Sequence, residues 1–379
     1  MTGVEWGLPV VAKYWIGGVS AGAFFTFFLW QGLQIQRFKP VARLAWISSA
    51  VFAVAIPLPI LSHLGQPGRF LNVLTDFHWS SPMSWAGPIL IAYVLVVLLN
   101  GRFFFFEDVV MAYRSATGFR KLAYRFLIVT KPPEGDIPKS SDLVVKVTGA
   151  LGLLLVLSFV YTGFELGVTG SRPIWANPLN PLMFLVSGFF SGMAFVALLW
   201  GLIDPLAKGE PGANGTAFMR SLMLPSLVAL FLAMNVVGFI TLAYQSPEVR
   251  SSVEVLATGE LSLLFLWVGI VVCALVPAVM LTLNSFLRTP SRLVLVVSCA
   301  LIFVGSFAQK YGFVVGGQLT GPGSAGVTPW PTGAEVFEFV AILALLYVLL
   351  QIGLWLSPWR WGPEPGPQAP ASGEVVVRT

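Results

Sequence analysis

Charge is scarce in this sequence. Asp, Glu, Lys and Arg make up 10% of its 379 residues, whereas hydrophobic residues make up 56%. Soluble domains carry roughly 25% charged residues, and the mean hydropathy here is +0.82. This shortage of charge excludes an ordinary soluble domain. It indicates an integral membrane protein, with the lipid membrane as its first partner.

Cysteine is almost absent as well. The two cysteines, Cys273 and Cys299, both fall inside apolar runs and form no CxxC pair. A disulfide framework or an iron–sulfur cluster needs more thiols at closer spacing. We therefore expect no iron–sulfur cluster in this protein.

Histidine is equally rare, and its two copies, His63 and His78, lie on one connection between apolar runs. A b-type haem with two imidazole ligands needs histidines that face each other within a helix bundle. These two are poorly placed for that, so we expect no haem. A single axial imidazole stays open as an alternative.

The formal net charge of +5 raises the question of a nucleic-acid partner. The basic residues, however, lie in short connections between apolar runs, where they set the topology of membrane proteins. We expect no nucleic-acid partner. No basic segment precedes the first apolar run, which continues to spanning length, so no cleavable signal peptide is predicted either.

Apolar runs of about 20 residues recur along the chain, each long enough to cross a hydrocarbon core about 30 Å thick as a helix. The runs are continuous and do not alternate as barrel strands do. The sequence therefore predicts an all-α fold with about nine transmembrane helices. Their expected ranges are 15–36, 44–62, 84–106, 147–166, 181–203, 221–243, 260–283, 291–312 and 335–356.

The Lys and Arg residues are distributed unequally between the two sides of this topology. All but five of the 22 lie on the side of the first connection; the five are Lys13, Arg69, Arg172, Arg250 and Lys310. By the positive-inside rule, the N-terminus is predicted to lie outside the cell membrane and the C-terminus in the cytoplasm.

Two segments are not expected to span the membrane. The cytoplasmic connection 107–146 interleaves aromatic and basic residues, which suits a short interfacial amphipathic helix; a solvated basic loop is the alternative. These residues are Tyr113, Phe119, Tyr124 and Phe126 with Arg114, Arg120, Lys121 and Arg125. The tail 362–379 is rich in Pro and Gly and is predicted to be disordered.

The sequence resembles itself at an offset of 170 residues. Gly18 and Gly22 fall on Gly188 and Gly192, each pair near the outer end of a span that enters from the same side. This predicts a parallel repeat, with a first four-helix bundle in 1–166 and a second in 167–318. An outer loop and a ninth helix would follow in 319–361. The GxxxG spacing alone indicates tight helix packing.

The few ionisable residues at membrane depth are expected to gather at the outer face, around the stretch 61–87. Such groups are costly in lipid and mark sites unless they are paired. Tyr161 and Glu165 share one helix face at i and i+4, and His63 follows Pro57 and Pro59, where a kink is expected. The candidates are Lys13, His63, Arg69, Asp76, His78, Tyr161, Glu165 and Arg172.

Several of these residues also have structural interpretations. Arg69 and Arg172 are equally consistent with headgroup anchors or with salt-bridge partners of Asp76 and Glu165. His78, beside a tryptophan, fits an interfacial aromatic belt just as well. The residue types alone do not choose between these roles.

Several stretches resemble the NrfD-like family, the membrane subunits of polysulfide reductase and related complexes. The resemblance covers about 15–318. It rests on WIGGVSAG, LSHLGQPGRF, FHWSSPMSWAG, YTGFELG, SRPIWANP, LWVGIVVCALVPAVML and FVGSFAQKYGFVVGGQ.

The resemblance implies an eight-helix core of two bundles without haem, which binds quinone in the first bundle near the outer face. Family members exchange electrons between a quinone pool and an extracytoplasmic ferredoxin-like four-cluster subunit, itself joined to a catalytic subunit that is often a molybdopterin enzyme. Tyr161 falls on a family tyrosine that contacts quinone. Lys13 falls where polysulfide reductase has a histidine, and His63 where many members have an aspartate.

We therefore expect a membrane anchor and quinone-reactive subunit of a respiratory oxidoreductase, with no redox centre of its own. His63 and Glu165 would move protons, and Lys13, Tyr161, Arg69, His78 and Arg172 would bind the quinone, menaquinone-like or other. The iron–sulfur partner would dock on 64–85, 171–181 and 312–333. The alternative is a secondary transporter or ion-translocating subunit, whose sites usually lie near the bilayer midplane.

Overall fold

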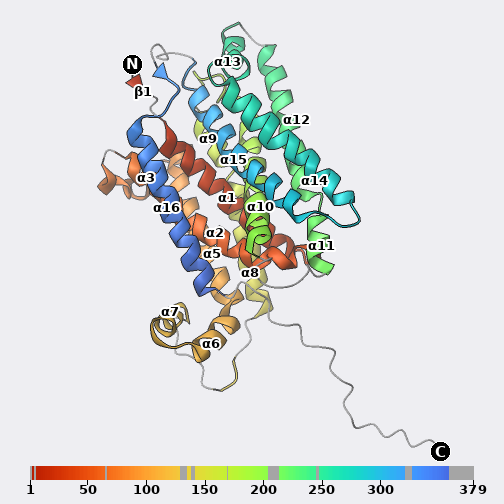
Figure 1. Ribbon diagram of the computed structural model, residues 1–379. Coiled ribbons are helices and arrows are strands. Elements are labelled where there is room, and N and C mark those ends of the chain that lie inside the picture. Colours follow the sequence, from red (N-terminus) through yellow and green to blue (C-terminus); the bar gives the residue numbers. More distant parts are fainter. Residues whose placement is uncertain are drawn as a thin grey trace, which may run out of the picture.

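The computed structural model describes residues 2–3, 6–64, 66–128, 135–137, 141–168, 170–203, 213–244, 247–320 and 327–357. The tail 362–379, predicted to be disordered, lies outside these residues. Figure 1 shows a stack of long helices that run side by side along most of the molecule. We use "outer end" for the end that carries the connection 61–87, following the predicted orientation, and "inner end" for the opposite one.

The helices that make up the spans account for most of the described residues. They are α1 (Leu8–Gln31), α2 (Lys39–Ala55), α3 (Pro57–His63), α5 (Pro82–Phe104), α8 (Asp142–Ser158), α9 (Tyr161–Gly167), α10 (Asn180–Ile203), α12 (Met223–Ala243), the π-helix η4 (Leu263–Leu275), α14 (Val276–Phe286), α15 (Arg292–Gly316) and α16 (Gly333–Leu356). Helices satisfy their own backbone hydrogen bonds, which lipid cannot do. Nine stretches of the described residues are long and apolar enough to cross a membrane, so the prediction of nine spans is confirmed.

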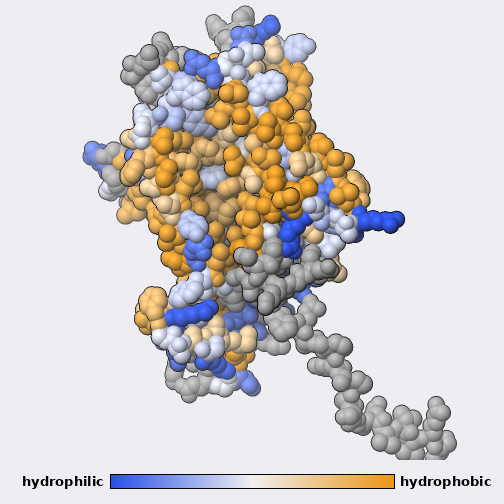
Figure 2. Space-filling model, viewed as in Figure 1, coloured by the Kyte–Doolittle hydropathy of each residue, from blue (hydrophilic) through white to orange (hydrophobic). Residues whose placement is uncertain are grey.

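Shorter elements lie at the two ends of these helices. At the outer end are η2 (Pro67–Arg69), α4 (Asn72–Thr75) and α13 (Pro247–Ala257); towards the inner end are η1 (Gln36–Phe38), α6 (Phe106–Ser115), α7 (Gly118–Ile128) and α11 (Ala213–Met219). Figure 2 shows a broad apolar band across the middle of the visible face, with hydrophilic residues concentrated above and below it. This band is the surface expected of a multi-pass membrane protein.

The first span begins earlier than predicted. Helix α1 begins at Leu8 instead of near residue 15, with a proline in its first turn, where the missing N–H costs nothing. Lys13 therefore lies inside the helix, about a turn and a half from its start. The prediction from hydropathy placed the start of the first span after Lys13, because a lysine lowers the mean hydropathy of the residues around it.

Helices α2 and α3 are separated by a turn at Ile56. Pro57 opens α3, and Pro59 lies in its first turn, which confirms the kink expected before His63. A proline supplies no N–H to the helix and clashes with the preceding turn. The break directs α3 towards the outer end, where His63 forms its last residue.

The packing partners divide into two groups of helices. In the first group α1 packs on α2 and α8, and α5 packs on α2, α8 and α9; in the second, α10 packs on α12 and α15, and η4 and α14 pack between α12 and α15. The groups meet mainly where α1 crosses α10. Helix α16 packs on α1, α2 and α3. The limits predicted for the two bundles, 1–166 and 167–318, stay a prediction.

The crossing of α1 and α10 joins the two copies of the glycine repeat. A β-carbon on Gly22 would overlap the carbonyl oxygen of Gly188 and lie 2.9 Å from Cα of Gly192. A β-carbon on Gly18 would lie 3.2 Å from Cα of Gly188. The backbones are therefore in direct contact here, as the GxxxG spacing predicted.

Both the start of α16 and the N-terminus are held by defined contacts. The Thr332 backbone N–H donates to Glu335 Oε2 at 2.8 Å while the Glu335 N–H donates to Thr332 Oγ1, which forms a capping box. Nearby, the short strand β1 (Thr2–Gly3) pairs in parallel with β2 (Val327–Thr328). The N-terminus is thereby tied to the outer loop.

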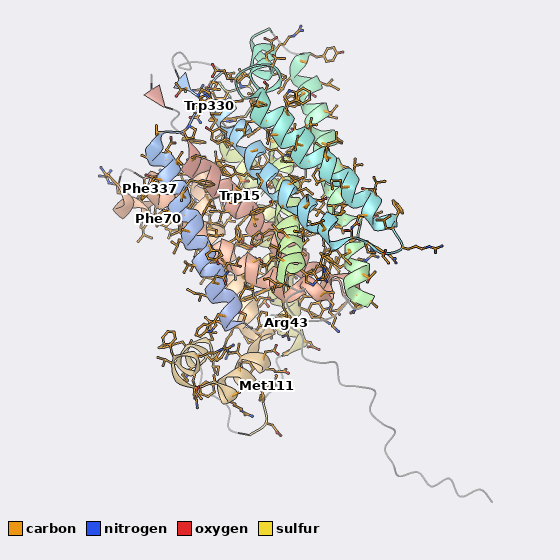
Figure 3. The ribbon with its side chains drawn as sticks, viewed as in Figure 1. Trp15, Arg43, Phe70, Met111, Trp330 and Phe337 are labelled. Atoms are coloured by element: carbon orange, nitrogen blue, oxygen red, sulfur yellow. The ribbon has the colours of Figure 1, made fainter. Side chains whose placement is uncertain are left out.

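An ion pair closes the inner end of the first bundle. Arg43 Nη2 of α2 lies 2.8 Å from Asp108 Oδ2 of α6. Burial raises the pKa of the Asp108 carboxyl above its ordinary value, and the positive charge of Arg43 acts in the opposite direction. Figure 3 marks Arg43 near this end, with Met111 of α6 beyond it.

Candidate functional site

A cavity of about 390 Å³ opens at the outer end of the first bundle. Its walls come from α1, α3, α5 and α9, and its mouth from the residues that follow α3. Most of its lining is apolar, including Ile56, Pro59, Ile60, Phe70 and Leu90; Figure 3 labels Phe70 at the edge of the bundle. The volume lies in the range of ligand-binding pockets.

Five of the predicted site residues line this cavity. They are Lys13, His63, Arg69, Tyr161 and Glu165. They come from four separate segments of the sequence: α1, the end of α3, η2 and α9. The expectation that these residues lie at one membrane face is consistent with this placement.

An ion pair forms the polar wall of the cavity. Lys13 Nζ lies 2.8 Å from Glu165 Oε2, and the hydroxyl of Tyr14 donates to the same oxygen at 2.9 Å. Glu165 is only 1% exposed. Breaking a buried pair by removing one partner leaves an uncompensated charge and is strongly destabilising. The distance shows that Glu165 pairs with Lys13, and not with Arg69 or Arg172, the partners considered from the sequence.

The second carboxylate oxygen of Glu165 is left without a hydrogen-bond partner. Its Oε1 atom is buried and accepts no hydrogen bond from the described residues, although Glu165 lines the cavity. Buried polar atoms are satisfied in the great majority of cases. An unsatisfied acceptor in a cavity wall indicates that a ligand, a water molecule or a proton completes it.

Tyr161 occupies the first turn of α9, after a break in the helix at Phe159 and Val160. Hydroxyls bond back to the preceding turn on both sides of this break, from Ser158 to Leu155 O and from Thr162 to Phe159 O, a pattern that bends helices. The break brings Tyr161 against both the large cavity and a smaller space beside Gly18 and Gly188. Within the described residues, no hydrogen bond is found for its hydroxyl.

His63 and Arg69 line the mouth of the cavity, and both side chains are exposed. An exposed imidazole can pass protons to and from solvent. A guanidinium at the mouth offers donors to a polar group that enters or leaves. Their individual roles stay predictions.

His78 does not line the cavity. It lies exposed in the turn before α5, and its carbonyl accepts the Ser81 N–H at 3.1 Å. The rings of Phe77, Trp79 and Trp85 cluster around this turn at centroid distances of 5.1 to 5.3 Å. The surroundings of His78 resemble an aromatic belt.

Arg172 also lies outside the cavity wall. Its guanidinium donates to the backbone carbonyls of Gln318 and Thr320, beyond the end of α15. Gln318 in turn bonds the backbone of Trp6, one of the lining residues. Arg172 therefore ties the connection before α10 to the second bundle and reaches the cavity only through Trp6.

Two residues of chemical interest were missed from the sequence. Tyr14 was not considered. The available signal was its position next to the candidate Lys13, because a buried tyrosine hydroxyl normally needs a hydrogen-bond partner. Lys310 was counted only as an outer-side cation, yet it is 4% exposed, and its Nζ donates to Ser187 Oγ at 2.8 Å. The polar pair Gln309 and Lys310 inside an apolar run was the available signal.

Metal ligands do not cluster in the described part of the protein. No group of three or more His, Cys, Asp and Glu side chains there is arranged to hold a metal ion. Cys273 and Cys299 are buried free thiols. The expected absence of haem and of iron–sulfur clusters stays a prediction.

Comparison with known proteins relates the fold and the cavity to one family. Residues 1–322 match the sequence profile described as polysulphide reductase, NrfD. Protein NrfD of Escherichia coli is 28% identical over 330 residues, which cover 83% of this chain and 95% of the relative. A selenate reductase subunit of Mesobacillus selenatarsenatis is 24% identical over 292 residues, 74% of this chain and 67% of that protein. A polysulfide reductase polypeptide of Wolinella succinogenes is 23% identical over 326 residues, with coverages of 83% and 95%. This chain therefore belongs to the NrfD family.

Proposed function

We propose that this protein, a membrane subunit of an oxidoreductase complex, binds the head group of a quinone in the outer cavity of the first bundle. It would exchange electrons there with an extracytoplasmic iron–sulfur subunit. The observation that carries the proposal is the cavity itself, because an apolar slot of about 390 Å³ ends on a lysine, a tyrosine and a glutamate. The family match supports the same function.

The residues of the cavity fit the groups of a quinone. The apolar lining suits the ring and the isoprenoid tail. The Lys13 ammonium and the Tyr161 hydroxyl both line the space, and each can donate a hydrogen bond to a carbonyl oxygen. A buried carbonyl oxygen that is left without a donor costs about 1–3 kcal/mol. These two donors would therefore stabilise a bound quinone.

Interconversion of a quinone and its quinol moves two electrons and two protons. Glu165 is suited to hold a proton because its Oε1 is unsatisfied and its Oε2 is already fixed by Lys13 and Tyr14. His63 at the exposed mouth is suited to exchange that proton with solvent. We assign the proton path to these two side chains.

The electrons would come from a partner at the outer end. The proposed docking surface comprises 64–85, 171–181 and 312–333, of which 65 and 321–326 lie outside the described residues. The partner is a ferredoxin-like four-cluster subunit, joined to a catalytic subunit of the molybdopterin type; two of the relatives are named as parts of selenate reductase and polysulfide reductase. The complex would lie in the cell membrane, with the N-terminus of this protein outside.

A transporter is the competing function, and Lys310 is the residue that bears on it. Lys310 is a buried ionisable group in the second bundle, next to a space of about 30 Å³ lined by Ser187, Asn235 and Gln309. A space of that size holds about one water molecule. It does not fit an organic solute, so the large outer cavity favours the quinone function.

The test is quinone turnover by the complex purified with its partner subunits. Tyr161→Phe should weaken quinone binding by up to roughly a hundredfold through the loss of one hydrogen bond, while assembly and turnover with an artificial electron donor or acceptor stay unchanged. Tyr244→Phe, at a tyrosine that is 88% exposed, is the matched control. Equal quinone kinetics in wild type, Tyr161→Phe and Lys13→Met would show that the pocket lies elsewhere.

A further inference from the structure

Helix α7 has two apolar faces, of which one is buried against the protein and the other is largely exposed. Tyr124 and Ile128 are 2% and 0% exposed and pack with residues of α6 in a small core. Phe119, Leu122 and Phe126, at i, i+3 and i+7, are 75%, 52% and 74% exposed. Residues at this spacing share one side of a helix, so α7 presents a largely exposed apolar stripe.

The charges of α7 are all of one sign. The helix contains Arg120, Lys121 and Arg125 and no acidic residue. The neighbouring helix α6 has two acidic residues, Glu107 and Asp108, both in its first turn, and Asp108 forms an ion pair with Arg43. An apolar stripe beside cationic side chains is the composition of helices that lie in the surface of anionic membranes.

Contacts at both ends fix α7 against the inner ends of two spans. Near its start, the ring of Phe119 stacks on Trp355 of α16 with centroids 6.3 Å apart, and Arg120 Nη2 donates to the Trp355 carbonyl at 3.3 Å. Near its end, Arg102 of α5 donates to the Ile128 carbonyl at 2.7 Å. Figure 1 shows α7 nearly end-on while α16 runs along the page, so α7 lies across the direction of the spans.

The contact with Trp355 indicates what the stripe faces. Only 17% of the spanning window of α16 is buried, so most of the surface of this helix is available to lipid. Trp355 lies in its last turn, at the depth where tryptophan prefers the headgroup region. Phe119 packs on that ring, and the stripe therefore continues the lipid-facing surface of α16.

We propose that α7 is an interfacial helix that binds anionic phospholipid in the leaflet at the inner ends of the spans. Phe119, Leu122 and Phe126 insert at the boundary of headgroups and acyl chains. The positive charges of the helix attract the lipid phosphates. The proposal concerns a surface away from the cavity and does not depend on the proposed quinone function.

Depth measurements on the whole protein test the insertion. A spin label at Phe126→Cys is read in vesicles of equimolar phosphatidylcholine and phosphatidylglycerol, with Asp136→Cys as the aqueous control and Val340→Cys of α16 as the lipid control. The native cysteines are buried and stay unlabelled. The label at position 126 should collide more with oxygen than with a water-soluble nickel complex. Accessibility to nickel equal to that of position 136 would overturn the proposal.

Lipid selectivity tests the charges. The combined Lys121→Gln and Arg125→Gln variant should retain phosphatidylglycerol roughly thirtyfold more weakly, measured as lipid bound to the purified protein, and the wild-type preference should fall with added salt. Arg250→Gln, an exposed arginine at the outer end, is the control and should leave retention unchanged. Equal retention by wild type and the double variant would overturn the proposal. Two further results would overturn it: protection of the label at position 126 from nickel only when partner subunits are present, and spin–spin broadening between labels on two copies of the protein.

Discussion

Gly22 of α1 and Gly188 of α10 touch through their backbones, although they lie in different groups of helices and far apart in the sequence. Helix α1 therefore serves both groups of helices. One of its faces lines the outer cavity with Lys13 and Tyr14, and another packs against α10. The edge-to-face contact of Tyr14 with Phe184, 5.5 Å between centroids, extends this junction to the cavity wall.

The glycine contact gives the first prediction. Gly22→Ala and Gly192→Ala should each separate α1 from α10, because the added methyl group meets backbone atoms that have no room to move. Thermal unfolding in detergent should show a loss of several degrees or more for each. Gly333→Ala, where a β-carbon meets nothing within 4 Å, should leave the midpoint unchanged. An unchanged midpoint in Gly22→Ala would contradict the close crossing.

A double-mutant cycle measures the pair of Lys13 and Glu165. Glu165→Gln alone leaves the lysine without its counter-charge and should cost about 3–5 kcal/mol, as should Lys13→Met alone. The combined variant should lose much less than the sum. Glu260→Gln, at an exposed carboxylate outside the cavity, is the control. Additive losses would mean that the two side chains do not interact in the folded protein.

The buried amine of Lys310 gives a third prediction. Ser187→Ala removes its hydroxyl partner at 2.8 Å and should cost about 1–3 kcal/mol of stability. The same substitution in a Lys310→Met background should be nearly neutral, because no amine is left to satisfy. Stability curves of the three variants and the wild type provide the measurement, and equal costs in both backgrounds would argue against the contact.

Topology is tested by reporter fusions. Fusions after Arg43 and Tyr124 should report a cytoplasmic location, and a fusion near Asp76 should report the outside, because the basic residues concentrate on one side. An outward-facing Tyr124 would reverse the sidedness of the cavity and of α7 together.

The last prediction concerns redox centres. The purified protein, stripped of partners, should show no Soret band and no stoichiometric iron, since it has two histidines on one connection and two separate cysteines. Absorption spectroscopy and metal analysis check this directly. A haem spectrum retained through purification would remove the proposal that quinone takes electrons straight from a partner.

Periodicity and hydropathy predicted much of the fold, because each span must be continuously apolar to enter lipid. The glycine repeat also predicted the close contact between Gly18 or Gly22 and another helix. The π-helical form of Leu263–Leu275 was not predicted. Its sequence is as apolar as that of the neighbouring α-helices, so hydropathy does not distinguish the two forms.

The sequence predicted the depth of the site residues in the membrane, but not the direction in which their side chains point. Lys13, Tyr161 and Glu165 were expected at one membrane face, yet their pairing depends on the rotation of α1 against α9, which a sequence of apolar residues does not define. The same limit hid Tyr14. Arg172 shows the converse: it has the expected depth, but its guanidinium faces the carbonyls of Gln318 and Thr320.

The ion pair between Lys13 and Glu165 has a consequence for biogenesis. The two residues are 152 positions apart, so at a synthesis rate of about 5–20 residues per second α1 is made roughly 8–30 s before its counter-ion. During that interval the lysine can extend its ammonium to the nearby headgroups. Arrival of the fourth span then draws the charge inward. The cavity wall is thus completed only after nearly half of the insertion steps have taken place, and an insertase that releases α1 early would release an unfinished pocket.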